Sequence, residues 1–302
     1  MSKPASEAVY GRPDPELADF PSGAIQTSPL IPGSTPLEDL PDTALARFVV
    51  AAPPATLERR YALAHALRAL KPGGELIAMA PKDRGGQRLK AELESFGCEA
   101  ETEGRRHQRL ARTTRPAKPA GLDAAIADGA LREAGPGVWT QPGVFSWDRL
   151  DPGSERLLPH LDGLSGEGAD LGCGLGVLSR RALRSPAITA LTLIDIDRRA
   201  TDAARRNIAD PRATILHADV RTAPLEGLDF VIMNPPFHAG GSEDRSLGQT
   251  FIRKAAAALH RGGKLYMVAN VDLPYEALLA ELFNRVQPLE KAGGFKLFMA
   301  VR

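Results

Sequence analysis

The chain has 302 residues, of which 43% are hydrophobic and 25% are charged, as in ordinary globular proteins. Its 38 Lys and Arg residues nearly balance its 37 Asp and Glu residues, so the net charge of +1 creates no strong field that demands a nucleic-acid or membrane partner. The two cysteines, Cys98 and Cys173, exclude a disulfide scaffold and a multi-cysteine metal site. The length predicts about two domains.

The first residues contain no apolar segment typical of a signal peptide, and no apolar run approaches the roughly 20 residues that span a bilayer. We therefore expect a cytoplasmic protein with no membrane contact and no bound metal. Residues 1–41 contain eight prolines. Proline fixes φ and lacks a backbone donor, so we expect an irregular leader that is either extended or disordered.

Strand-like and helix-like segments alternate after the leader. A short apolar run over 48–50 is followed by apolar residues at helical spacing over 55–70. Pro72-Gly73-Gly74 is expected to end that helix, and 76–79 is predicted to be a strand. The later expected elements are a helix over 87–96, a strand over 109–111, a helix over 177–183 and strands over 191–194, 215–216 and 229–233. This alternation predicts an α/β fold with a parallel sheet.

Two segments of the first half recur in the second half. Residues 48–54 match 230–236 at an offset of 182, and residues 69–76 match 258–265 at an offset of 189. The difference implies seven extra residues in the second half, which we place in 238–244. The alternative is a chance likeness between two common strand–helix units.

A duplication would leave the first copy degenerate. At this offset Ala52 stands where the second copy has Asn234, and no glycine-rich loop precedes it. We expect 42–118 to form a smaller degenerate α/β half-copy without a cofactor, and 119–302 to form the catalytic domain.

The glycine-rich loop Gly172-Cys173-Gly174-Leu175-Gly176 is the strongest cofactor signal. Its glycines allow a tight turn and a close approach of a ligand to the backbone, although such a loop alone also suits a nicotinamide cofactor. Asp195 ends the next strand and suits two ribose hydroxyls, and Asp219 follows the strand after that and suits an adenine amine. Asp170 is either a cofactor ligand or a structural acid.

Two nearby residues are expected to have structural roles. Asp197 is predicted to be a solvated residue at a helix start. Cys173 is predicted to pack rather than act as a nucleophile, because no His is placed to activate it.

The segment Asn234-Pro235-Pro236-Phe237 follows the strand over 229–233, at the end of the strand where ligands of open α/β sheets bind. The two prolines fix the turn, so the Asn234 amide oxygen and the Pro235 carbonyl form two adjacent acceptors for a planar amine. Phe237 can stack on the ring that bears this amine. The alternative is a stiff turn without chemistry.

These motifs resemble those of class I S-adenosylmethionine-dependent methyltransferases, and Asn-Pro-Pro-Phe resembles the subgroup that methylates exocyclic or amide nitrogens. Phe145-Ser146, Asp151-Pro152-Gly153-Ser154 and 268–275 narrow the resemblance to the RsmC-type small-subunit rRNA guanine-N2 methyltransferases. The resemblance covers about 143–302. Residues 70–111 resemble the later part of the degenerate N-terminal copy that this family carries.

The resemblance implies a Rossmann-like sheet that binds S-adenosylmethionine. It implies that the segment around Phe145 covers the methionine end of the cofactor, and that Asn234 and Pro235 hold the guanine amine. The implied cofactor-binding residues are Phe145, Asp151, Ser154, Asp170, Gly172, Gly174, Gly176, Asp195, Asp219 and Asn234. The implied catalytic residues are Asn234, Pro235 and Phe237. The chain departs from the family in its N-terminal part, which looks too short for a full methyltransferase fold.

One local basic run interrupts the neutral chain. Its members lie within 14 residues that contain no acid: Arg105, Arg106, Arg109, Arg112, Arg115 and Lys118. The run joins the two halves and suits phosphate contacts, with the first four arginines as expected RNA ligands. The alternative is a solvated edge strand protected by its charge.

The expected substrate is guanine N2 of 16S rRNA, either free or in the small ribosomal subunit. The alternatives are a protein glutamine or adenine N6, although those subgroups usually carry Tyr or Trp where this chain has Phe237. A non-catalytic ribosome assembly factor is a further alternative. The sequence does not indicate an oligomeric state.

Overall fold

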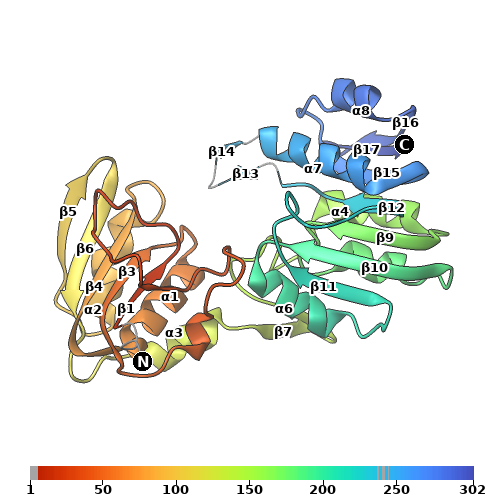
Figure 1. Cartoon of the computed structure of the whole chain (residues 1–302). Helices are drawn as coiled ribbons and strands as arrows, with labels where there is room; N and C mark the ends of the chain where they lie inside the picture. The colour runs from red at the N-terminus through yellow and green to blue at the C-terminus, as the bar shows by residue number, and fades with distance from the viewer. Residues whose placement is uncertain (1–5, 237, 240–241, 244) are drawn as a thin grey trace. The chain divides into compact units, whose positions relative to one another are not determined.

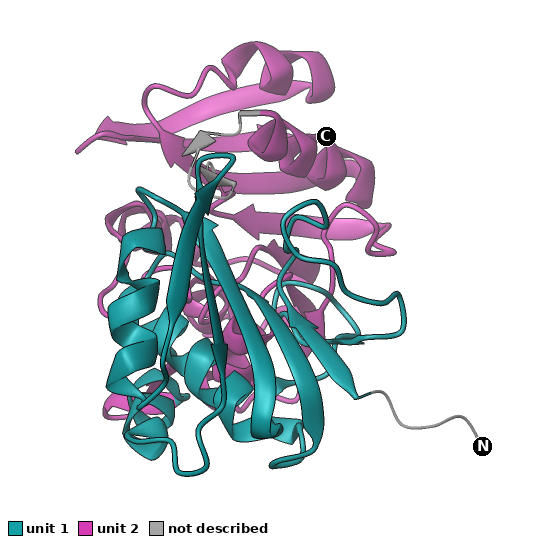
Figure 2. Ribbon diagram, turned by 90° about the vertical axis from the view of Figure 1, so that its left-hand side faces the viewer, with its two compact units in different colours: residues 1–131, 141–143 teal, residues 132–140, 144–302 magenta. Residues whose placement is uncertain are grey.

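The computed structural model describes residues 6–236, 238–239, 242–243 and 245–302. The chain forms two compact units, one of residues 1–131 with 141–143 and one of residues 132–140 with 144–302 (Figure 2). Each unit is built on a twisted, mainly parallel sheet, as the sequence predicts. No helix in the described part of the chain is long and apolar enough to cross a bilayer.

The first unit is built on a six-stranded sheet (Figure 1). Its elements are β1 (Glu7–Tyr10), β2 (Ile25–Gln26), η1 (Leu37–Asp39), β3 (Leu45–Ala51), α1 (Thr56–Ala69), β4 (Leu70–Pro81), η2 (Gly86–Arg88), α2 (Leu89–Ser95), β5 (Glu101–Arg105), β6 (Gln108–Thr114) and α3 (Leu122–Gly129). The strand order is β2-β1-β3-β4-β6-β5, with β1 to β4 parallel and β6 and β5 antiparallel to their neighbours. Residues of α1, α2 and α3 share one buried cluster with the sheet.

The prediction of an irregular leader is wrong for two segments. β1 pairs in parallel with β3, and β2 pairs with β1, so residues 7–10 and 25–26 belong to the sheet. Ala8 and Tyr10 are buried in the core. The prolines flank these strands and leave their backbone donors intact, which is why the strands can form.

The predicted boundary at 118 also differs from the observed one. α3 lies after that boundary, yet Ala125 is buried in the core of the first unit, with Leu122 and Ile126 packed against it. A Cβ on Gly129 would lie 2.4 Å from the Tyr61 Cβ, so this glycine permits close packing of α3 on α1. This apolar contact extends the first unit to residue 131.

The second unit is built on a seven-stranded sheet. Its elements are β7 (Arg132–Gly135), β8 (Val138–Thr140), α4 (Pro152–Leu157), η3 (Leu158–Leu161), β9 (Gly166–Leu171), α5 (Val177–Ala182), β10 (Ile188–Asp195), α6 (Arg198–Asn207), β11 (Ala213–His217), β12 (Leu228–Met233), β13 (His238–Ala239), β14 (Ser242–Glu243), α7 (Arg245–Ala258), β15 (Leu259–Asn270), α8 (Glu276–Leu282), β16 (Arg285–Ala292) and β17 (Phe295–Val301). The order is β11-β10-β9-β12-β15-β17-β16, with β17 and β16 antiparallel to their neighbours.

Both sheets repeat one topology. The order β2-β1-β3-β4-β6-β5 corresponds to β10-β9-β12-β15-β17-β16 in position and in strand direction. Each also carries the same irregularity, since the register shifts between Leu45 and Arg47 against β4 and between Leu228 and Phe230 against β15. This shared register shift supports a duplication of the sheet rather than a chance likeness between the two halves.

The shared register corrects the alignment of the two copies by one residue. Matching the two irregularities gives an offset of 183 for β3 and β12, because Leu45 then corresponds to Leu228. Ala51 therefore stands in the place of Asn234, not Ala52. The offset between β4 and β15 stays at 189, since Leu70 matches Leu259. The second half thus has six extra residues rather than seven.

Candidate active site

The predicted site residues lie at the carboxyl ends of neighbouring strands in the second unit. Gly172 follows β9, Asp195 ends β10, Asp219 lies beyond β11 and Asn234 follows β12. The strand order runs in opposite directions from β9 and from β12. Open parallel sheets bind ligands at such a switch point, so the topology explains why these side chains gather there.

Two cavities open at this edge of the sheet. One has a volume of about 460 Å³, and its wall includes Asp195, Asp219 and Pro235. The other has a volume of about 390 Å³ and is lined by residues 145–151 and Ser154. Both cavities are lined by Phe145, Gly172, Gly174 and Asn234. These volumes are typical of small-molecule sites.

The three glycines of the loop have different structural roles. Gly172 and Gly174 have φ values of 74° and 53°, and both line the cavities. Gly176 is absent from both walls. A Cβ on Gly176 would lie 2.7 Å from the Ile208 Cδ1, so it permits packing of α5 against the end of α6. The third glycine therefore supports the loop rather than lining the cavity.

Asp195 ties the end of β10 to the glycine loop. Its Oδ2 accepts a hydrogen bond from the Gly174 N–H at 2.8 Å, and its Oδ1 accepts one from the Asp197 N–H at 2.9 Å. Burial raises the pKa of Asp195 to about 6, although these backbone hydrogen bonds oppose the shift. The carboxylate is thus rigid and ionised at neutral pH, with acceptor capacity left for a ligand.

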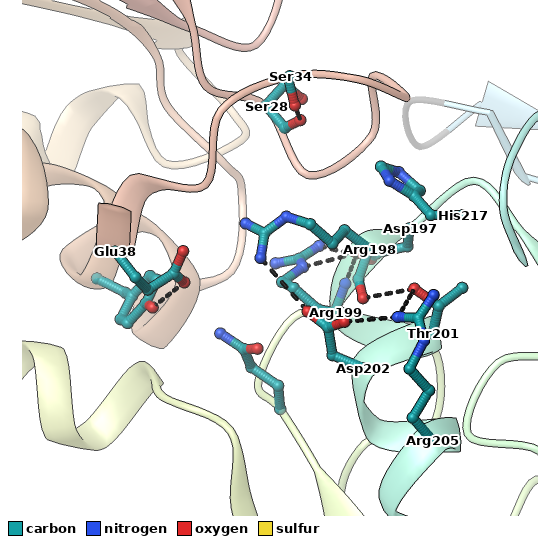
Figure 3. A network of polar contacts seen from close by, with 12 residues as sticks. Ser28, Ser34, Glu38, Asp197, Arg198, Arg199, Thr201, Asp202, Arg205 and His217 are labelled. Carbon is teal, nitrogen blue, oxygen red and sulfur yellow. Dashed lines mark hydrogen bonds and ion pairs between the residues drawn. The ribbon is translucent and has the colours of Figure 1, made fainter. Parts of the chain in front are cut away.

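Asp197 is the N-cap of α6, as predicted, but it is buried rather than solvated. Its side chain accepts from the Arg199 backbone N–H at 3.0 Å and forms a two-pronged ion pair with the Arg199 guanidinium at 2.9 and 2.8 Å (Figure 3). Because the ion pair with Arg199 neutralises the charge of Asp197, this N-cap can be buried next to Asp195.

Asp219 has an arginine partner that the sequence did not reveal. Arg221 Nη2 donates to Asp219 Oδ2 at 2.6 Å, and the Arg221 backbone N–H donates to Oδ1 at 2.9 Å. The side-chain hydrogen bond from Arg221 lowers the pKa of Asp219. Both residues line the larger cavity, so the carboxylate is held ionised there.

Asn234 has a fixed amide. Its Nδ2 donates to Asp151 Oδ2 at 2.8 Å and to Ser154 Oγ at 2.9 Å. The sequence predicted all three residues as site residues but did not predict this contact. It joins residues about 80 positions apart at the boundary of the two cavities.

The expectation of Asp170 as a cofactor ligand is not supported by its position. The side chain is fully buried, belongs to neither cavity wall and accepts a hydrogen bond from Ser179 Oγ at 2.6 Å. Burial raises the pKa of Asp170 to about 7. It is a structural acid that links β9 to α5.

Cys173 has the expected packing role. The side chain is buried in a cluster of leucines and isoleucines. Burial, with the charges of Asp195 and Asp170, raises the pKa of the Cys173 thiol well above its usual value. A protonated thiol is a poor nucleophile.

Apolar side chains of the larger cavity were missed by the sequence reasoning. They are Ile196, Val220, Leu247 and Phe251. Ile196 and Val220 directly follow the two acids that were singled out, so this adjacency was an available signal. Apolar side chains of this kind suit an aromatic ring system.

Phe237 lies outside the described residues, and its expected stacking on a base has no structural description.

The basic run does not link the two units, because most of it forms the β5–β6 hairpin at the edge of the first sheet. Arg105 and Arg106 are exposed near its tip, where Arg106 pairs with Glu16. Arg112 lies between Glu75 and Glu103, at 3.9 and 3.7 Å.

The methyltransferase small domain family matches residues 136–299 of the chain. The ribosomal RNA small subunit methyltransferase C of Pseudomonas putida KT2440 is 32% identical over 262 residues, which cover 82% of this chain and 77% of that protein. The protein of the same name from Pseudomonas paraeruginosa PA7 is 35% identical over 254 residues, which cover 80% and 75% of the two chains.

A solved structure shares the whole fold. The T. thermophilus 16S rRNA N2 G1207 methyltransferase (RsmC), in complex with AdoMet and guanosine, matches with a TM-score of 0.83 and 24% identity. The match covers 100% of this chain and 89% of that one. The chain therefore belongs to the methyltransferase small domain family and, within it, to the ribosomal RNA small subunit methyltransferase C proteins.

Proposed function

We propose that the chain transfers a methyl group from S-adenosylmethionine to the exocyclic N2 amine of a guanine in 16S rRNA. The observation that carries the proposal is the Asn234 amide, whose nitrogen binds Asp151 and Ser154 while its oxygen accepts no hydrogen bond from any described residue and would be available to a substrate at the cavity wall. The names of the relatives support the substrate class, because they act on small-subunit RNA.

The described residues fit this cofactor. Asp195 offers acceptors to ribose hydroxyls. Asp219 lies next to the apolar wall, and its carboxylate would accept the adenine amine in exchange for part of its pairing with Arg221. A Cβ on Gly172 would lie 3.3 Å from the Phe251 ring, and both residues line the larger cavity. When bound, S-adenosylmethionine supplies an electrophilic methyl group on a positively charged sulfur.

The residues of the site act on the amine by position. The Asn234 Oδ1 and the Pro235 carbonyl would accept the two hydrogens of the amine, which leaves its lone pair directed away from them. A guanine amine is a poor nucleophile because its lone pair is delocalised into the ring. Catalysis then comes from orientation and exclusion of water rather than from a strong base, and the proton released after transfer can pass to water.

Substrate RNA would contact the first unit through the β5–β6 hairpin. The arginines proposed for phosphate contact are Arg105, Arg106 and Arg109. Arg112 is a weaker candidate than the sequence suggested, since Glu75 and Glu103 compete for it, and Glu16 competes for Arg106 in the same way. Arg115 has a structural role, because its Nε donates to the Leu67 carbonyl at 2.7 Å. We expect no cofactor in this unit, because Ala51 replaces the key asparagine.

A substrate panel tests the proposal. Purified protein with S-adenosylmethionine is incubated with naked 16S rRNA, with small ribosomal subunits and with a release-factor-like protein, and release of S-adenosylhomocysteine is followed. The proposal predicts turnover with at least one RNA substrate. Turnover only with the protein would favour a glutamine methyltransferase, and no turnover with any substrate would favour a non-catalytic assembly factor.

Asn234→Ala is the informative variant in this panel. Loss of one positioned acceptor should lower kcat by about 2.7–4 kcal/mol, by analogy with a lost oxyanion-hole donor. Asn284→Ala is the matched control, because Asn284 is an exposed asparagine of the same unit that lines neither cavity.

A further inference from the structure

The amide of Asn234 is oriented by two partners on one short helix. Its Nδ2 carries two hydrogens, and the two bonds to Asp151 Oδ2 and Ser154 Oγ, at 2.8 and 2.9 Å, use both. Among the residues that the structure describes, none donates a hydrogen bond to the Asn234 Oδ1. The amide therefore binds the protein with its nitrogen and presents its oxygen.

The carboxylate of Asp151 determines which end of the Asn234 amide, nitrogen or oxygen, faces it. An isolated asparagine can turn by 180° and exchange its oxygen and nitrogen at little cost. An ionised carboxylate has only acceptors, so it excludes the orientation in which the amide oxygen would face Asp151. In that excluded orientation the amide nitrogen would face the substrate, where it would repel an incoming amine.

The segment Asp151-Pro152-Gly153-Ser154 is built to hold this carboxylate in place. Asp151 is the N-cap of α4, and its Oδ2 accepts the Ser154 backbone N–H at 2.6 Å. A Cβ on Gly153 would lie 2.8 Å from the Phe295 ring and 3.1 Å from Asp151 Oδ2. Only glycine leaves room for both, so the start of α4 packs closely against Phe295 of β17.

We propose that Asp151 and Ser154 are positioning residues that fix the orientation of the Asn234 amide, so that its oxygen faces the amine to be methylated. This assignment differs from the role in covering the methionine end that the sequence implied. It rests on the proposed function, since the oriented oxygen matters only if it accepts the substrate amine.

A reciprocal exchange of side chains tests this assignment. Asp151→Asn keeps a good helix cap, so the variant should fold, but the introduced amide can present either end to Asn234. Asn234→Asp places two carboxylates face to face and leaves no hydrogen between them. The double variant Asp151→Asn/Asn234→Asp restores one donor facing one acceptor, with an oxygen still directed at the substrate.

The readout is single-turnover methyl transfer at saturating cofactor and RNA, with the cofactor Kd measured separately. We expect Asp151→Asn to slow the step about 10-fold and Asn234→Asp about 100-fold, with cofactor Kd changed less than about threefold in Asp151→Asn. The double variant should recover to within about 10-fold of the wild-type rate, faster than Asn234→Asp alone, although each single change slows the step. Asp272→Asn, at an exposed aspartate outside both cavities, is the control.

A wild-type rate for Asp151→Asn, or a double variant no faster than the slower single variant, would overturn the assignment. A residue that merely stabilised α4 would give additive losses and no rescue. The proposed function is tested in the same series by the wild-type protein and by Asn234→Ala. If these behave as that function requires and the exchange gives no rescue, the positioning role alone fails.

Discussion

Asp195 carries the sharpest prediction about cofactor binding. Its carboxylate already accepts two backbone hydrogen bonds, and a carboxylate has about four acceptor positions, so two remain for ribose hydroxyls. Hydrogen bonds to charged groups contribute roughly 1.5–3 kcal/mol each. At the lower value the two sum to about 3 kcal/mol, so Asp195→Ala should raise the Kd for S-adenosylmethionine about 100-fold.

The same residue predicts the pH dependence of binding. Burial raises the pKa of Asp195 to about 6, and only the ionised form offers full acceptor strength. Wild-type affinity should therefore fall as pH drops through about 6. The free energy of unfolding changes with pH in the opposite direction. The neutral Asp195 carboxyl contributes stability that is complete below about pH 3.8 and is lost as pH rises through about 6.

Isothermal titration calorimetry at pH 5, 6, 7 and 8 measures both effects. The loss of affinity through pH 6 should disappear in Asp195→Ala, because the group that titrates there is removed. Asp272→Asn should behave as the wild type. The assignment of Asp195 would be refuted by an unchanged Kd in Asp195→Ala at pH 8.

Three further predictions concern other parts of the molecule. Gly176→Ala should lower the free energy of unfolding by about 1–3 kcal/mol, because φ is 81° and the new Cβ would meet Ile208. Denaturant titration measures this change, and an unaltered unfolding midpoint would contradict the packing role. Glu92→Ala should cost about 3–5 kcal/mol of stability, because it leaves the fully buried Arg59 unpaired, yet calorimetry should show unchanged cofactor affinity. Replacing Arg105, Arg106 and Arg109 of the hairpin by Ala should raise the KM for RNA and flatten the salt dependence of RNA binding, without changing cofactor affinity. RNA binding that kept its full salt dependence would refute the RNA contact.

The sequence predicted the second unit better than the first. The glycine loop follows β9, Asp195 ends β10 and Asn234 follows β12, and parallel strands bring such positions to one edge of the sheet. β1 and β2 were missed because they are short and lie between prolines, and only their pairing with β3 makes them strands. The wrong offset of 182 arose because it aligns Phe48 with Phe230 and the prolines at 53–54 with those at 235–236, whereas the strand register requires 183.

The side-chain geometry of the site could be predicted only in part. The residue types at Asp151 and Asn234 were recognised, but their contact joins distant segments and depends on how α4 packs on the sheet. Asp170 was ambiguous because a strand-end acid can face a ligand or a neighbouring helix, and only the register of β9 decides between them. Here it faces Ser179 of α5.

Nucleoside mass spectrometry of the RNA product shows whether the chain methylates guanine N2 through Asn234. Naked 16S rRNA and small subunits are treated with S-adenosylmethionine and either the wild-type protein or Asn234→Ala, then digested to nucleosides and mapped by fragment. We expect N2-methylguanosine at one position with the wild-type protein and at least 100-fold slower formation with Asn234→Ala. Methyl groups on adenine N6, or equal rates for the two proteins, would contradict the proposed function.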